Sequence, residues 1–189
     1  MSTFESNNRA PVMSFAPELL LQAQPVKLLV LDVDGVLTDG GLLFGAEGET
    51  LKRFHTLDGH GIKLLQQAGI AVAIISGRDS AALRARLHAL DVRHIYTGVA
   101  QKLPVAEGLL TEVGCTWPQV AVMGDDWPDL PMLARAGFTC APPQAHAEVL
   151  ARVHHVTRKD AGAGAVRECC DLLLCAVGSY ATLLDAAWD

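Results

Sequence analysis

Residues 28–40 read LLVLDVDGVLTDG, an apolar run that ends in two aspartates one residue apart. The run Val26–Leu31 has the length and aliphatic content of a buried strand in the middle of a parallel sheet, and Gly35 breaks it. Because side chains alternate along a strand, Asp32 and Asp34 are expected to point to the same side and to share one small space. Two like charges held this close need a proton or a cation between them. The stretch therefore predicts a divalent metal at the carboxyl end of a strand, where open α/β sheets bind ligands. The alternative is an Asx-turn or a helix cap, which explains only one of the two aspartates.

The rest of the chain repeats the same alternation of apolar strands and amphipathic helices. After a short helix over Phe15–Ala23, capped by Ser14, the sequence predicts a hairpin within residues 41–55 and a helix that begins at Asp58. Further elements are expected as strands at Ile70–Ile75, Arg93–Tyr96, Gln119–Met123, Gly137–Cys140 and Val153–Val156, and as helices from Asp79, over Lys102–Val113, near Ala145–Ala151 and over Val166–Leu174. This order is typical of an α/β fold with a doubly wound, mostly parallel, Rossmann-like sheet. A small β-hairpin flap takes the place of a cap domain.

Length and composition favour one domain. The chain has 189 residues, half of them hydrophobic, which suits a single core over residues 25–189 behind an N-terminal tail and short helix over residues 1–24, with a helical C-terminal tail. The net charge of −6, without a basic run, argues against nucleic acid and favours small-molecule partners. Five cysteines without C-x-x-C spacing, most of them inside apolar stretches, indicate buried thiols in a reducing cytosol. With no signal peptide and no span of about 20 apolar residues, we expect a cytoplasmic protein without a membrane partner.

Polar residues follow two further predicted strands. Ser76 follows Ile70–Ile75, and Asp125, Asp126 and Asp129 follow Gln119–Met123. Lys102 begins a helix between them, and the exits of parallel strands lie along one edge of a sheet. A carboxylate nucleophile, a metal, a fixed cation and a hydroxyl donor together suit phosphoryl transfer.

These residues carry a family resemblance. DVDGVLTDG at residues 32–40, SGR at 76–78, Lys102 and GDDWPD at 124–129 resemble the four motifs of the haloacid dehalogenase-like phosphatases, over Lys27 to Leu133. The hairpin, HTLDGHGIKLL at 55–65 and GAGAVRE at 162–168 resemble members of that family that serve lipopolysaccharide synthesis. The resemblance implies a magnesium-dependent homotetramer that hydrolyses 3-deoxy-D-manno-octulosonate 8-phosphate to the sugar acid and phosphate through an aspartyl-phosphate.

The resemblance also implies roles for the acidic residues. Asp32 would attack phosphorus, and Asp34 would protonate the leaving alcohol and then activate water. Magnesium would be held by the Asp32 carboxylate, the Asp34 backbone carbonyl and Asp125, with Asp129 just behind the ligands. Asp126 is either a neighbour of the metal site or the N-cap of a helix at Pro128.

The phosphate and the sugar acid would be held by other residues. Ser76 and Lys102 are implied to bind the phosphate, although Ser76 alone reads as a helix cap and Lys102 alone as a solvated charge. The residues implied to contact the substrate are Asp34, His55, Thr56, Leu57, Asp58, Gly59, Lys63, Arg78, Arg86 and Lys102. The arginines suit a carboxylate, which a guanidinium holds with two hydrogen bonds. Lys63 stands where arginine is expected in many relatives.

Two other functions remain open. One is a phosphatase for another sugar acid phosphate, such as a sialic acid 9-phosphate, because the motifs define the chemistry better than the substrate. The other is a receiver-like module that accepts a phosphoryl group without turnover, although its acidic pair normally lies on a separate strand.

The glycines of KDAGAGAVRE, residues 159–168, allow close approach of the backbone to a ligand or unusual backbone angles. We expect the hairpin and the C-terminal tail to contribute to subunit packing or site closure.

Overall fold

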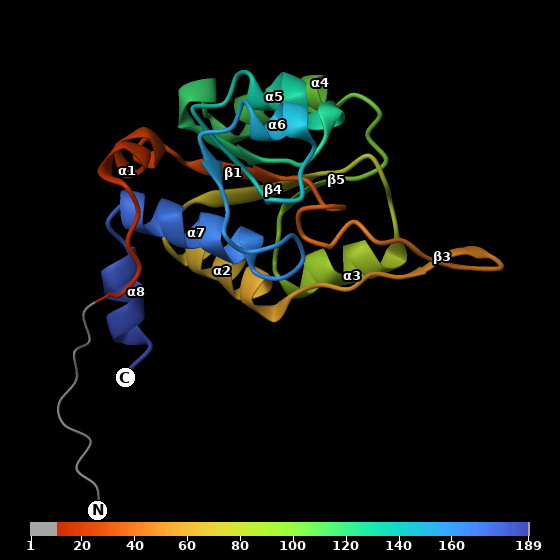
Figure 1. Ribbon diagram of the computed structural model, residues 1–189, viewed down its shortest axis with the longest axis horizontal. Coiled ribbons are helices and arrows are strands. Elements are labelled where there is room, and N and C mark those ends of the chain that lie inside the picture. The colour runs from red at the N-terminus through yellow and green to blue at the C-terminus, as the bar shows by residue number, and fades with distance from the viewer. Residues whose placement is uncertain (1–10, 189) are drawn as a thin grey trace, which may run out of the picture.

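The computed structural model describes residues 11–188, and its centre is a six-stranded sheet in which every strand pair is parallel. The strand order is β5-β4-β1-β6-β7-β8 (Figure 1). The strands are β1 (Leu28–Leu31), β4 (Ala71–Ile75), β5 (His94–Tyr96), β6 (Val120–Met123), β7 (Phe138–Ala141) and β8 (His155–Val156). The apolar stretch that begins at Leu28 thus lies in the middle of the sheet, as predicted.

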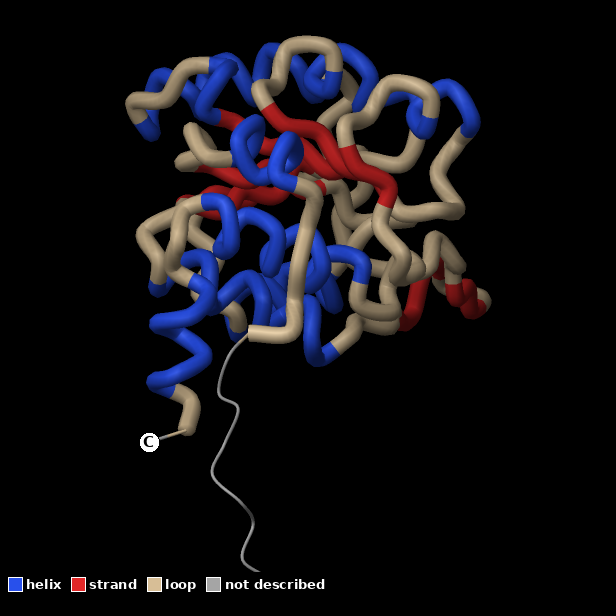
Figure 2. The backbone as a smooth tube through the Cα atoms, turned by 60° about the vertical axis from the view of Figure 1, so that its left-hand side comes forward, coloured by secondary structure: helices blue, strands red, loops and turns tan. Residues whose placement is uncertain are grey.

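Helices cover both faces of this sheet, which confirms the doubly wound α/β fold (Figures 1 and 2). One layer holds α2 (Thr56–Gln67), α3 (Ala81–Ala89) and α7 (Ala165–Ala176), with α1 (Pro17–Ala23) and α8 (Tyr180–Ala186) packed on α7. The other holds α4 (Lys102–Val113), α5 (Leu130–Leu133) and α6 (Ala147–Leu150), and the 3₁₀ helices are η1 (Trp117–Gln119) and η2 (Trp127–Asp129). Strand β1 contributes to both layers, because Leu29 and Leu31 pack in one apolar cluster and Leu28 and Val30 in the other.

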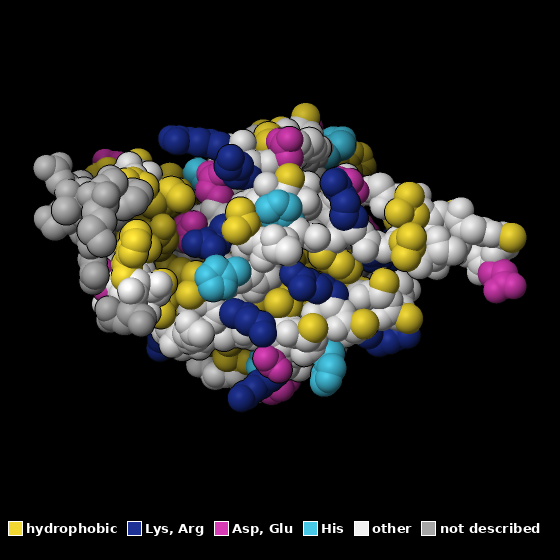
Figure 3. All heavy atoms as spheres, turned by 90° about the horizontal axis from the view of Figure 1, so that it is seen from below, with side chains coloured by type: hydrophobic (Ala, Val, Ile, Leu, Met, Phe, Trp, Pro, Cys, Tyr) yellow, Lys and Arg dark blue, Asp and Glu magenta, His cyan; other side chains and the backbone are white. Residues whose placement is uncertain are grey.

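The predicted hairpin flap forms a separate two-stranded sheet of β2 (Leu43–Gly45) and β3 (Gly48–Leu51). It projects from the body of the molecule with apolar side chains on its surface (Figures 1 and 3). Leu43, Phe44 and Leu51 are each more than half exposed. The flap therefore presents apolar surface that residues 11–188 leave uncovered.

Several predicted helix starts were wrong by two residues. Helix α1 begins at Pro17 rather than Phe15, and its N-cap is Ala16, which makes no side-chain cap hydrogen bond. Proline at the first helical position needs no N–H donor, so it starts the helix in place of Ser14. Helix α2 begins at Thr56 rather than Asp58, and α3 begins at Ala81 with Ser80 as its cap. The helix over Lys102–Val113 was predicted correctly. Most of the predicted N-terminal tail, residues 1–10, lies outside the described residues.

Within residues 11–188, no single helix is long and apolar enough to cross a membrane. Helices α7 and α8 together have the length and apolar composition of a membrane span, but the chain bends by 108° between them. The five cysteines are free; Cys140, Cys169 and Cys170 are buried, as predicted, whereas Cys115 and Cys175 are only half-buried.

Candidate active site

Three neighbouring strands bring their polar exits to one edge of the sheet. Strand β1 pairs with β4 on one side and β6 on the other, so Asp32, Ser76 and Asp125 follow adjacent strand ends. The pairing continues past the strands, since Asp32 N–H donates to Met123 O at 3.1 Å and Ser76 N–H to Tyr96 O at 2.9 Å. The predicted convergence of the exits is therefore present.

Three carboxylates gather at this edge. One oxygen each from Asp32, Asp125 and Asp129 lies within 4.8 Å of the other two. Burial, and then the charge of Asp129, raises the pKa of Asp32 to about 6. Burial, and then the charges of Asp32 and Asp129, raises the pKa of Asp125 to about 7. Carboxylates that repel one another in this way form a set of hard oxygen donors, and these residues fit a divalent cation.

Lys102 contacts two members of this set, Asp32 and Asp129. The Lys102 ammonium lies 2.8 Å from both Asp32 Oδ1 and Asp129 Oδ1. Burial opposes the charged form, but the two carboxylates outweigh it and raise the pKa of Lys102. The other oxygen of Asp129 accepts from the N–H groups of Asp125 (3.1 Å) and Asp126 (3.4 Å), with Asp126 at the N-cap of η2. Asp129 is thus occupied in holding its neighbours, which leaves Asp32 and Asp125 with more capacity for a cation.

Gly35 makes room for Asp125. Its φ is +86°, a conformation that other residues rarely adopt, and a Cβ there would lie 2.1 Å from Asp125 Oδ2. Any side chain at this position would displace the carboxylate. The glycine after the aspartate pair is therefore part of the site as well as a break in the strand.

Asp34 does not join the carboxylate set, in contrast to the expectation that it shares a space with Asp32. Its Oδ1 contacts the Lys52 ammonium, and its Oδ2 lies 3.7 Å from Arg78 Nε. The strand ends at Leu31, so the alternation of side chains that suggested a shared space no longer holds at Asp34. The second aspartate faces the hairpin flap instead.

Sequence reasoning missed Glu49 and Lys52, which the flap brings to Asp34. Lys52 also lies 2.8 Å from Glu49 Oε1, and Arg78 Nη2 lies 3.1 Å from Glu49 Oε2. Burial opposes the charged form of Lys52, but hydrogen bonds to Asp34 and Glu49 outweigh it and raise its pKa. Residues three apart along a strand point to opposite faces, so the sequence offered no signal for this contact.

Ser76 is not a helix cap. Its side chain is buried, and its Oγ accepts from Arg78 N–H at 3.3 Å. Ser80 caps α3 instead, with its Oγ accepting from Leu83 N–H at 3.2 Å. Ser76 thus lies at the exit of β4 beside the other polar exits, the place at which a phosphate-binding hydroxyl is expected.

Arg86 of α3 and the start of α7 hold the turn before α2 in place. Arg86 Nη2 donates to His55 O at 3.3 Å and lies against Gly59, where a Cβ would be 2.2 Å from it. Asp58 is buried, and its Oδ1 accepts from Arg167 N–H at 2.8 Å, at the start of α7. Arg86 and Asp58 therefore support the predicted substrate turn, and neither side chain stands free on the surface.

Three predicted contact residues lie on the outside of α2. Thr56 and Leu57 are exposed, and Lys63 is 45% exposed in its side chain and lies 3.8 Å from Asp91. Lys63 is one of the predicted residues that the structure does not bring to the carboxylate set within one chain.

The glycine-rich loop before α7 meets backbone of its own chain. Gly162 has a φ of +61°, and a Cβ there would lie 2.6 Å from Asp39 N and 2.7 Å from Thr38 C. Gly162 N–H donates to Val36 O at 3.2 Å. The unusual backbone angle predicted for this loop is present, and the close approach is to the backbone of residues 38–39, whereas approach to a ligand stays a prediction.

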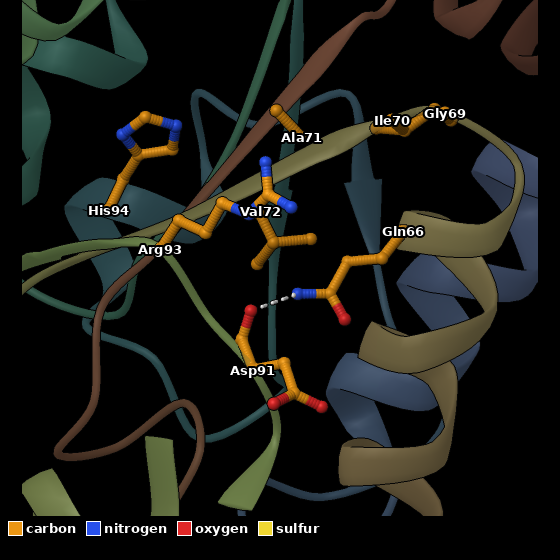
Figure 4. A pocket seen from close by; sticks show the side chains of 8 residues that line it. All are labelled: Gln66, Gly69, Ile70, Ala71, Val72, Asp91, Arg93 and His94. Atoms are coloured by element: carbon orange, nitrogen blue, oxygen red, sulfur yellow. Dashed lines mark hydrogen bonds between the residues drawn. The ribbon is translucent and has the colours of Figure 1, made fainter. Parts of the chain in front are cut away.

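A separate hollow of about 360 Å³ lies at the amino ends of β4 and β5, away from the carboxyl ends that carry the acidic residues (Figure 4). Gln66 crosses it and donates to Asp91 O at 3.1 Å. Its other lining residues are Gly69, Ile70, Ala71, Val72, Arg93 and His94. None of the acidic set faces it, so the chemistry belongs at the carboxyl edge.

Comparison with known proteins agrees with this geometry. The model of the haloacid dehalogenase-like hydrolase family matches residues 92–168. The 3-deoxy-D-manno-octulosonate 8-phosphate phosphatase of Yersinia pestis is 43% identical over 161 residues, which cover 85% of this chain and 86% of that protein.

Two solved structures are similar along most of the chain. A probable phosphatase from Pseudomonas syringae has a TM-score of 0.90 at 41% identity, covering 92% of this chain and 99% of that one. The 3-deoxy-D-manno-octulosonate 8-phosphate phosphatase of Moraxella catarrhalis, in complex with magnesium, phosphate and the sugar acid, has a TM-score of 0.87 at 37% identity, covering 90% and 98%. On this similarity, and on the motifs gathered at its sheet edge, the chain belongs to the haloacid dehalogenase-like hydrolases.

Proposed function

We propose that this protein is a magnesium-dependent phosphatase that hydrolyses 3-deoxy-D-manno-octulosonate 8-phosphate. The observation that carries the proposal is the set Asp32, Asp125, Asp129 and Lys102, in which one ammonium holds the attacking carboxylate beside two others. The phosphatases of Yersinia pestis and Moraxella catarrhalis described above are named for this substrate. The structure of the second contains magnesium, phosphate and the sugar acid.

In this proposal Asp32 is the nucleophile. The ammonium of Lys102, 2.8 Å from Oδ1, fixes the carboxylate and offers positive charge to the phosphoryl oxygens. Ser76, beside it at the exit of β4, donates its hydroxyl to a phosphoryl oxygen. Magnesium, when held by the Asp32 carboxylate, the Asp34 carbonyl and Asp125, neutralises phosphate charge. Asp129 keeps Lys102 and the 125–126 backbone in place.

Asp34 is the acid and base of the reaction. In the first step the Asp32 oxygen bonds to phosphorus, the ester bond breaks, and Asp34 gives its proton to the leaving oxygen. In the second step water attacks phosphorus, its proton passes to Asp34, and the Asp32–phosphorus bond breaks. Turnover of this kind separates a phosphatase from a phosphoryl acceptor.

The sugar acid requires a cation for its carboxylate. Arg78 is the better placed of the two arginines, because its side chain is 43% exposed and lies 3.7 Å from Asp34 Oδ2. A guanidinium there can hold a carboxylate with two hydrogen bonds. Arg86 acts through the His55 carbonyl that it supports. Thr56, Leu57 and Lys63 lie on the outside of α2. We propose that they contact substrate only in an assembly in which a second subunit completes the site.

A homotetramer accounts for the exposed hairpin. Leu43, Phe44 and Leu51 are each more than half exposed, and surface of this kind is typically covered by a partner. The free thiols suit a reducing cytoplasm.

A substrate panel tests the proposal. Purified protein with magnesium is given 3-deoxy-D-manno-octulosonate 8-phosphate, a sialic acid 9-phosphate and 4-nitrophenyl phosphate, and kcat/KM is measured for each. We expect the first to exceed the others and Asp32→Asn to release only a trace of phosphate from any of them. A higher value for the sialic acid ester assigns a different sugar acid, and substantial release by Asp32→Asn removes it as nucleophile.

A further inference from the structure

Lys52 differs from the other cations of the hairpin region in being covered. It follows β3, and its side chain is 1% exposed, against 69% for its neighbour Arg53. Its ammonium contacts Asp34 Oδ1 and lies 2.8 Å from Glu49 Oε1. Lysine side chains are seldom fully buried unless they are paired with a carboxylate. The burial of Lys52 is therefore explained by Asp34 and Glu49, and the question is what this ion-pair cluster does at the sheet edge.

The two oxygens of Asp34 have different surroundings. Oδ1 contacts Lys52 and also Thr38 Oγ1 at 3.5 Å. Within the described residues, Oδ2 meets Arg78 Nε at 3.7 Å, which is longer than a hydrogen bond. One oxygen is therefore held by the flap, and the other has no hydrogen bond within the described residues and is open to a reacting group.

Glu49 connects the same cations from the flap. Its Oε1 lies 2.8 Å from Lys52 Nζ, and its Oε2 lies 3.1 Å from Arg78 Nη2. Arg78 therefore reaches both Glu49 and Asp34, independently of Lys52. A chain without the ammonium at position 52 still has a cation between flap and sheet edge, so the flap keeps its attachment.

We propose that Lys52 is a positioning residue of the phosphoryl-transfer reaction. From the flap it holds Oδ1 of Asp34, so that Oδ2 faces the leaving oxygen in the first step and the attacking water in the second. The inference rests on the proposed function, in which Asp34 gives a proton to the leaving oxygen and takes one from water. It adds that the flap supplies part of the catalytic geometry from within the same chain.

Two other roles for Lys52 give different results. If Lys52 bound the phosphoryl oxygens directly, its loss would weaken the reaction whether or not Asp34 is an acid. If it only fastened the flap, its loss would lower stability and affect all substrates equally. The effect of a second mutation at Asp34 separates these cases.

The first experiment compares Lys52→Met, Lys52→Arg and the control Arg53→Met with phenyl phosphate and 4-nitrophenyl phosphate. The phenyl ester has the less acidic leaving group and depends more on proton donation. We expect Lys52→Met to lose about 10-fold of kcat/KM with phenyl phosphate, part of the roughly 10²- to 10⁴-fold that general acid catalysis contributes, and less with the nitrophenyl ester. Lys52→Arg should recover part of the loss, and Arg53→Met should match wild type because its exposed ion pair contributes little.

The second experiment repeats Lys52→Met in an Asp34→Asn background, with circular dichroism and thermal melting to establish that each variant is folded. We expect little further loss, because Lys52 acts through the carboxylate already removed. Equal losses in both backgrounds, or equal losses with both esters, would overturn the inference and leave the proposed function standing. A wild-type protein that releases no phosphate from either ester overturns both.

Discussion

Replacing Lys102 by methionine should destabilise the protein in a way that depends on pH. The ammonium lies 2.8 Å from oxygens of both Asp32 and Asp129, and all three side chains are at least 88% covered. Breaking a buried ion pair by removing one partner costs about 3–5 kcal/mol. Asp32, whose pKa is about 6 in the folded protein, is mostly ionised at pH 7, so the ion pair is charged at that pH. We therefore expect a loss of about 3–4 kcal/mol at pH 7.

The pH dependence follows from the sign of the shift. Burial and the charge of Asp129 already raise the pKa of Asp32 to about 6 in the folded wild type, and loss of the ammonium raises it further. At pH 5 Asp32 is mostly protonated in the wild type, so the ammonium has less charge to hold and the loss should be smaller than at pH 7. Folding would be measured by urea denaturation in the presence of a chelator, at both pH values.

A matched control is Lys63→Met, which removes an exposed cation 3.8 Å from Asp91. Its effect should stay within about 0.5 kcal/mol. In thermal melts Lys102→Met should lower Tm by about 6–16 °C, at about 2–4 °C per kcal/mol for a chain of this size. A loss no larger than the control, or one that grows as the pH falls, would refute the assignment of Lys102 as the cation that holds the carboxylate set.

Three other changes have defined outcomes. Asp34→Asn should slow turnover about 10²- to 10⁴-fold and let phospho-Asp32 accumulate in acid-quenched samples; wild-type turnover would remove Asp34 from the reaction. A chelator should abolish phosphate release and magnesium should restore it, with calcium a poor substitute because its longer coordination bonds misplace the attacking carboxylate; activity in excess chelator would contradict a metal site at Asp32 and Asp125. Gly162→Ala should lower stability by about 2–5 kcal/mol, from strain at positive φ and from overlap with the Thr38–Asp39 backbone, and an unchanged urea midpoint would disprove that contact.

The sequence predicted those parts of the site that depend on local pattern. Buried strands place their next residues at one edge whatever the details of packing, so Asp32, Ser76 and Asp125 were found from three apolar runs. Lys102 was found as the first residue of a helix whose limits the sequence also gave.

The contacts of Asp34 could not be predicted, because they depend on how a hairpin folds back onto a strand exit. Lys52 and Glu49 lie close together in sequence, and only the tertiary structure shows that they face Asp34 and Arg78 rather than solvent. The same holds for Asp58 and Arg86, which look like surface residues of two helices and instead join the helices to their neighbours.

The central position of β1 has a consequence for biosynthesis. Leu28 pairs with Ala71 on one side and Val120 on the other, so the strand that precedes Asp32 leaves the ribosome long before its second partner. At about 5–20 residues per second, the ribosome needs several seconds to bridge that interval. During this time the apolar segment Leu28–Leu31 has an unpaired edge, which is the kind of surface that chaperones bind and that aggregates. Asp32, the proposed nucleophile, is thus made early in translation but takes its place at the sheet edge only after β6 has emerged.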